Sequence, residues 1–74
     1  MTTIYLVRHG QASFGAESYD KLSPNGELQA KLLGQYLDKI LKEEPYVVAG
    51  SMLRHQQTAS FALAESFSDA QIVT

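Results

Sequence analysis

The chain has 74 residues, a formal net charge of −2 and no cysteine. A chain of this length forms one domain at most and buries only about 60% of its unfolded surface. The composition excludes disulfides, and the presence of only two histidines argues against a conventional zinc site. The lack of a clustered basic run argues against a nucleic-acid-binding protein.

The first expected element is a strand at residues 4–7. These four residues form a continuous apolar and partly β-branched run, which is typical of a strand buried on both faces in a parallel sheet. The run is far too short for a signal peptide or a membrane span. Together with the absence of cysteine, which fits a reducing compartment, this predicts a cytoplasmic protein that does not associate with membranes. The polar segment 11–22 is predicted to be a loop.

A long helix is expected to begin at Ser23 and Pro24, because serine suits the N-cap and proline the first helical position. An apolar stripe follows at helical spacing, made of Leu28, Leu32, Leu33, Tyr36, Leu37, Ile40 and Leu41. Gly34 costs this helix about 1 kcal/mol relative to alanine, and we expect close packing against a sheet to be its reason. The helix should end at residues 43–45, Glu-Glu-Pro.

The second half repeats the pattern of strand and helix. Residues 46–49 are predicted to form a strand, Ser51 to cap a helix from residue 52 to about residue 67, and residues 71–74 to begin a third strand. The small residues on one face of this helix would let it lie close to a sheet. That face contains Ala59, Ala62, Leu63, Ser66 and Phe67. Phe61 points the opposite way, toward something outside the chain.

The order β-α-β-α-β favours an α/β fold with a parallel sheet and right-handed crossovers. Because the pattern stops as the third strand begins, we expect residues 1–74 to be the N-terminal portion of a single longer α/β domain.

The candidate site lies at the carboxyl ends of the first two expected strands. Arg8, His9 and Gly10 follow the first strand, and Arg54 lies in the first turn of the helix after the second. Ligands of open α/β sheets bind at this edge, and a helix N-terminus adds free N–H groups and partial positive charge. This combination predicts a site for a phosphate or another compact oxyanion.

Each of these residues has a chemical role in such a site. Arg8 and Arg54 can grip phosphate oxygens bidentately, and Gly10 lets the backbone approach the ligand. His9, with one neutral ring nitrogen, can attack phosphorus and form a phosphohistidine. Gln11, the next residue along, is included among the predicted substrate-binding residues.

The same side chains also have non-catalytic interpretations. His9 can be an ordinary loop histidine, and Arg54 a solvated helix residue. We interpret His55 as a surface residue near the mouth of the site and Ser51 as a cap rather than a nucleophile. Two loop carboxylates have no spacing that singles them out as acids: Glu17 and Asp20.

Three blocks of the sequence resemble the histidine phosphatase superfamily, also called phosphoglycerate-mutase-like. They are YLVRHGQAS, YDKLSPNGELQAKLLGQYL and AGSMLRHQQTA, and they occur in the order of the family and cover most of the chain. The resemblance implies a Rossmann-like three-layer sandwich and phosphoryl transfer through His9, with no metal or organic cofactor. It makes Arg8 and Arg54 the phosphate clamp, and Ser23 and Gly26 match the block that opens the first helix.

Two departures from the family pattern shape the expected activity. Gly15 stands where the glycolytic mutases carry asparagine, and the loop to Asp20 is short, which favours a phosphatase over a mutase. The family's general acid and second histidine would lie beyond Thr74, and Glu65 and Asp69 come too early to replace them. We therefore expect these 74 residues to be incomplete for turnover.

The sequence thus predicts a phosphomonoester phosphatase that acts on a phosphorylated small molecule or a phosphoprotein. Three alternatives stay open. The first is mutase-type phosphoryl transfer, and the second is a non-catalytic phosphate-binding or interaction module. The third is a small α/β fragment that self-associates through the face around Phe61.

Overall fold

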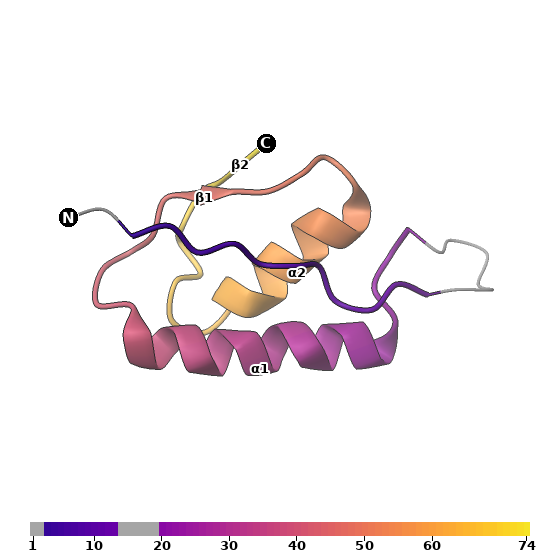
Figure 1. Cartoon of the computed structure of the whole chain (residues 1–74), viewed down its shortest axis with the longest axis horizontal. Helices are drawn as coiled ribbons and strands as arrows, with labels where there is room; N and C mark the ends of the chain where they lie inside the picture. The colour runs from indigo at the N-terminus through magenta and orange to yellow at the C-terminus, as the bar shows by residue number, and fades with distance from the viewer. Residues whose placement is uncertain (1–2, 14–19) are drawn as a thin grey trace.

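The computed structural model describes residues 3–13 and 20–74 (Figure 1). Its elements, in chain order, are α1 (Pro24–Ile40), β1 (Val47–Val48), α2 (Leu53–Leu63) and β2 (Ile72–Val73). The two strands pair in parallel, with Val47 opposite Ile72 and Val48 opposite Val73. The predicted α/β class, with parallel strands joined through a helix, is confirmed.

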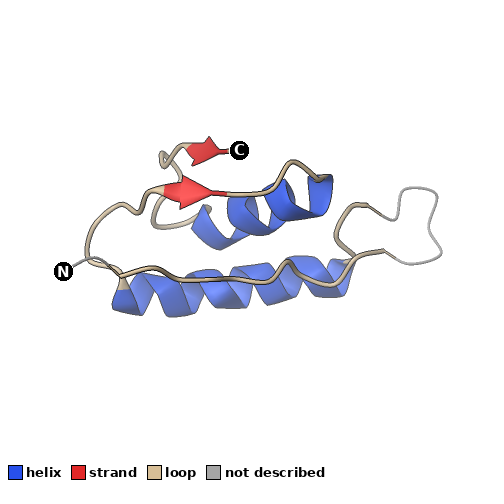
Figure 2. Ribbon diagram, turned by 45° about the horizontal axis from the view of Figure 1, so that its top comes forward, coloured by secondary structure: helices blue, strands red, loops and turns tan. Residues whose placement is uncertain are grey.

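The two helices pack against each other, and both lie on the same side of the two strands (Figures 1 and 2). The buried apolar side chains come from the loop before α1 and from both helices; they are Ala12, Leu22, Ala30 and Leu63. Two of these four residues are alanines, and a small side chain such as that of Ala30 in α1 lets the helices approach closely. This close approach matters for the site, because α1 and α2 carry most of the side chains around it.

Helix α1 begins as its sequence predicts. Ser23 is the N-cap, with extended backbone angles, and its hydroxyl accepts the N–H of Gly26 at 3.0 Å. Pro24 occupies the first helical position, where a missing N–H costs nothing. The predicted reason for Gly34 is wrong, because a Cβ atom at this position would overlap the carbonyl oxygen of Ala62 in α2. The glycine therefore permits close packing between helices, not against a sheet.

Helix α2 begins differently from the prediction. Its N-cap is Met52, which makes no side-chain capping bond, so the predicted cap at Ser51 is wrong. The carboxylate of Asp20 instead accepts the N–H of Leu53 at 3.1 Å. The helix ends at residue 63, four residues before the predicted end at 67, and turns follow it.

Phe61 lies beside α1 and makes one contact with it. Its ring is half-buried, and the Nζ atom of Lys31 lies 5.4 Å from the ring centroid. An ammonium group at this distance is attracted by the negative face of the ring. The ring is only half-buried, so the expectation that something outside the chain covers Phe61 stays a prediction.

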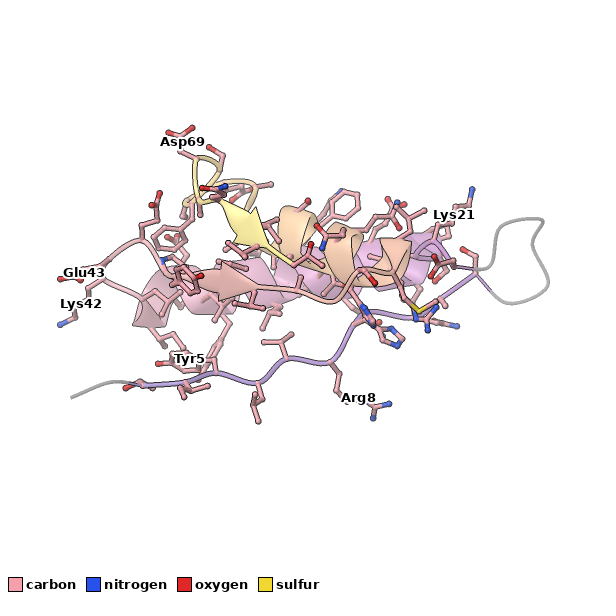
Figure 3. All side chains as sticks on the ribbon, turned by 90° about the horizontal axis from the view of Figure 1, so that it is seen from above. Tyr5, Arg8, Lys21, Lys42, Glu43 and Asp69 are labelled. Carbon is pink, nitrogen blue, oxygen red and sulfur yellow. The ribbon has the colours of Figure 1, made fainter. Side chains whose placement is uncertain are left out.

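Residues 4–7 are extended but form no strand, so the predicted buried strand is wrong. Ile4 is 79% exposed and Leu6 is 94% exposed. The segment runs in the same direction as β1, on the side of β1 away from β2 (Figure 3). A strand needs a hydrogen-bonded neighbour to bury an apolar run on both faces. Within the described residues β1 pairs with β2 and no ladder reaches residues 4–7.

The two ends of the predicted loop at residues 11–22 pair with each other. Ala12 and Leu22 form an isolated antiparallel bridge, and the N–H of Ser13 donates to the carbonyl of Lys21 at 3.0 Å. Gly15 and Glu17, which entered the sequence-based predictions, lie outside the described residues. No helix within the described ranges is long and apolar enough to cross a membrane.

Candidate functional site

Thr58 of α2 joins the turn at Gly10 to the helix that carries Arg54. The N–H of Gly10 donates to Oγ1 of Thr58 at 3.0 Å, and that hydroxyl donates to the carbonyl of Arg54 at 2.7 Å. Thr58 is 7% exposed, so this link is shielded from water. Sequence reasoning gave Thr58 no role, although its position four residues after Arg54 places both on one face of a helix.

Gly10 is buried, and the absence of a side chain at this position lets the backbone pack closely against α1. A Cβ atom added there would lie 2.5 Å from the carbonyl oxygen of Gly26 in α1. Gly26 in turn leaves no room for a Cβ atom beside the backbone of Gln11. The two glycines therefore let the turn after residue 9 lie directly on the first turn of α1.

Gln11 is tied to the start of α1 by both its backbone and its side chain. Its carbonyl accepts the N–H of Ser23 at 2.9 Å, and its own N–H donates to Oε1 of Gln29 at 2.9 Å. Its Oε1 accepts a hydrogen bond from the amide of Asn25 at 2.7 Å. These contacts fix the direction in which the chain leaves the candidate site, and the predicted substrate-binding role of Gln11 remains a prediction.

The two histidines of the chain lie side by side. The ring centroids of His9 and His55 are 5.7 Å apart, with 49° between the ring planes. His9 is exposed, and its Nδ1 lies 2.6 Å from the carbonyl oxygen of Gly10. The Nδ1 of His55 is buried and has no hydrogen-bond partner among the described residues. His55 thus lies next to the candidate nucleophile, and only its place after Arg54 in the sequence hinted at this.

Gly50, in the turn before α2, makes room for the His55 ring. A Cβ atom at Gly50 would overlap Nδ1 of His55. The turn at Gly50 therefore lies directly against the His55 ring. The ring can take this position because Gly50 has no side chain.

The two predicted clamp arginines differ in their surroundings. Nη1 of Arg54 forms a salt bridge of 2.8 Å with Oδ1 of Asp20, while Nε of Arg54 is buried without a hydrogen-bond partner among the described residues. Arg8 is exposed, and its side chain points away from the helices (Figure 3). The structure therefore brings Arg54 and the His9–Gly10 turn together, and it leaves the guanidinium of Arg8 outside this group.

A shallow hollow of about 240 Å³ lies beside the candidate nucleophile. It is lined by residues 7–10, by Gln29, Ala30 and Leu33 of α1, and by Thr58 of α2. Within residues 3–13 and 20–74, no group of three or more histidine, cysteine, aspartate or glutamate side chains is placed to hold a metal ion. The titratable side chains that the structure gathers near this hollow are the imidazoles of His9 and His55 and the guanidinium of Arg54.

One comparison with known proteins identifies the chain. The family model described as histidine phosphatase superfamily (branch 1) matches residues 4–73. No curated protein and no solved structure gave a significant match. The matched range includes His9, Arg54 and Thr58, which the structure brings together.

Proposed function

The chain belongs to the histidine phosphatase superfamily, branch 1, and from this membership we propose that it is a phosphomonoester phosphatase in which His9 accepts the phosphoryl group. Members of this superfamily are mostly enzymes, and their substrates are phosphorylated compounds. The observation that carries the proposal is the setting of His9. Its imidazole is exposed, while the turn that holds it is fixed to both helices.

The contact between His9 and the carbonyl of Gly10 supports one tautomer of the ring. A carbonyl oxygen only accepts hydrogen bonds, so Nδ1 at 2.6 Å carries the proton and donates it. A neutral imidazole with hydrogen on Nδ1 has its free electron pair on Nε2. In this proposal Nε2 is the nucleophile, and the Gly10 carbonyl stabilises the positive charge that develops on the ring during attack.

The proposed reaction has two displacements at phosphorus. The electron pair of Nε2 forms an N–P bond while the bond from phosphorus to the ester oxygen breaks, and that oxygen leaves with the bonding pair and takes up a proton. Water then attacks phosphorus, the N–P bond breaks, and phosphate and the free imidazole are released. The phosphohistidine is the intermediate that the two displacements share.

Proton donation to the leaving oxygen is the step with no assigned residue. No carboxylate among the described residues hydrogen-bonds to His9. The absence of a general acid lowers turnover of an alkyl phosphate by about 10²–10⁴. The proposal for residues 1–74 is therefore limited to capture of a phosphoryl group by His9, and it assigns no described residue to proton donation.

We assign the phosphate oxygens to the two arginines. Nη1 of Arg54 donates a hydrogen bond to Asp20, whereas Nε has no acceptor among the described residues. The exposed Arg8 side chain is free to change rotamer and swing toward His9, since exposed side chains interconvert within nanoseconds. Planar guanidinium groups match the spacing of phosphate oxygens, so binding of the ligand itself would draw Arg8 into the site.

Acetyl phosphate provides a direct test of phosphoryl capture. Its acetate leaves without prior protonation, so a missing general acid does not mask the step. The protein is mixed with radiolabelled acetyl phosphate, quenched in base and digested, and the labelled peptide is located. We expect label on the peptide that contains His9, no label in His9→Ala, and retained label in the matched variant His55→Ala.

Absence of label in the unmodified protein would refute the proposal. If the same protein still bound inorganic phosphate, the chain would instead be a non-catalytic phosphate-binding module. Retention of label in His9→Ala would refute the assignment of the nucleophile.

A further inference from the structure

The carboxylate of Asp20 is held at two points of α2 that are distant from it in sequence. Oδ1 accepts from Nη1 of Arg54 at 2.8 Å, and Oδ2 accepts from the N–H of Leu53 at 3.1 Å. These partners lie 34 and 33 residues further along the chain. Each carboxylate oxygen therefore has a donor of its own, which fixes the plane of the carboxylate relative to the helix.

This arrangement occupies only one nitrogen of the Arg54 guanidinium. A guanidinium has five N–H donors in a rigid plane and accepts nothing. Nη1 binds Asp20, whereas Nε is buried and has no hydrogen-bond partner in the described part of the chain. A buried donor without an acceptor is costly, so an anion that reached this side of the group would satisfy it. A phosphoryl oxygen is an acceptor of the required charge.

Asp20 can affect an anion at this site in two opposite ways. As a nearby negative charge it can compete with phosphate for Arg54, or as a fixed support it can hold the guanidinium in the orientation that phosphate needs. The geometry favours the support, because Asp20 contacts one terminal nitrogen and leaves Nε free. Its second bond, to Leu53, anchors the carboxylate to the helix backbone rather than to the guanidinium.

We propose that Asp20 is a positioning residue for Arg54, which holds the guanidinium so that its remaining donors bind the phosphoryl group; this inference rests on the proposed function. It assigns a role to a loop carboxylate that is neither nucleophile nor acid. It also explains why α2 lacks a local capping side chain, since the cap and the support are the same carboxylate.

The test measures two quantities in Asp20→Ala and Asp20→Asn. The first is the Kd of inorganic phosphate, from an NMR titration of the backbone amides, and the second is the rate constant for labelling of His9 by acetyl phosphate. We expect phosphate binding to weaken about tenfold in Asp20→Ala, a typical coupling within one salt-bridge network. We expect the labelling rate to fall between about 10-fold and 100-fold, as when a reacting group is misplaced.

Three controls separate positioning from folding and from charge. Met52→Ser, added to Asp20→Ala, supplies a local cap to α2 and should restore stability but not phosphate binding. Asp69→Asn removes one exposed negative charge from the loop between α2 and β2, which lies on the other side of the molecule from Arg8 in Figure 3, and should leave the Kd unchanged. On an Arg54→Ala background, Asp20→Ala should have no further effect on phosphate binding.

The outcomes distinguish this inference from the proposed function. Unchanged or tighter phosphate binding in Asp20→Ala overturns the positioning role, whatever happens to the labelling of His9. Restoration of phosphate binding by Met52→Ser also overturns it, because the carboxylate would then act only as a helix cap. Absence of label in the unmodified protein refutes phosphoryl capture, whereas a Kd that still depends on Asp20 through Arg54 supports the positioning role.

Discussion

Replacing Thr58 by valine tests the hydroxyl that joins the Gly10 turn to α2. Valine keeps the shape and the β-branch of threonine, so helix propensity and packing volume change little. The hydroxyl is lost, and the buried N–H of Gly10 then has no acceptor. The carbonyl of Arg54 loses only the bond from that hydroxyl. An unsatisfied buried donor costs about 1–3 kcal/mol, and we expect a destabilisation of this size.

Urea unfolding of the wild-type, Thr58→Val and Thr58→Ser proteins provides the measurement. Serine retains the hydroxyl and loses one methyl group, which costs about 0.8 kcal/mol. We therefore expect Thr58→Val to be the least stable of the three and to unfold at the lowest midpoint urea concentration. If the valine variant were as stable as the serine variant, the hydroxyl would contribute nothing and the reasoning would be wrong.

Substitutions at three further positions test the helix cap and the close contacts of two glycines. Ser23→Ala removes the cap of α1 and should cost about 1 kcal/mol in urea unfolding, whereas Ser23→Asp should retain most of that stability. Gly34→Ala places a Cβ atom against backbone, and the overpacking penalty of about 1–3 kcal/mol should exceed the gain of about 1 kcal/mol in helix propensity; a more stable variant would contradict the contact with Ala62. Gly50→Ala meets only a side chain, so we expect little loss of stability and a changed NMR shift of the His55 ring; unchanged shifts would contradict the contact.

The features that local sequence determines were predicted correctly. The start of α1 follows from Ser23 and Pro24, because a cap and a fixed φ act on their own neighbours. The two β-branched runs on either side of α2 predicted the strands, and a strand-helix-strand order predicted their parallel pairing. These inferences need no knowledge of distant parts of the chain.

The features that distant residues determine were not predictable. Residues 4–7 have the composition of a buried strand, but burial depends on a paired neighbour, which composition does not show. The side chain that accepts the first free N–H of α2 belongs to Asp20, which no local pattern around residue 51 reveals. The predicted phosphate-site residues are only partly gathered, because the exposed side chain of Arg8 points away from the helices. The place of His55 beside His9 follows from the docking of the Gly10 turn on both helices.

The link between Gly10 and Thr58 has a consequence for the order in which the molecule assembles. It joins residues 48 positions apart, whereas the contacts within α1 are local, and contacts between distant residues form later because loop closure costs entropy. The turn that holds His9 should therefore dock last during folding and detach first under denaturant. Phosphoryl capture would then disappear at lower urea concentration than the helical circular-dichroism signal, and the protein would lose its chemistry while its helices remained intact.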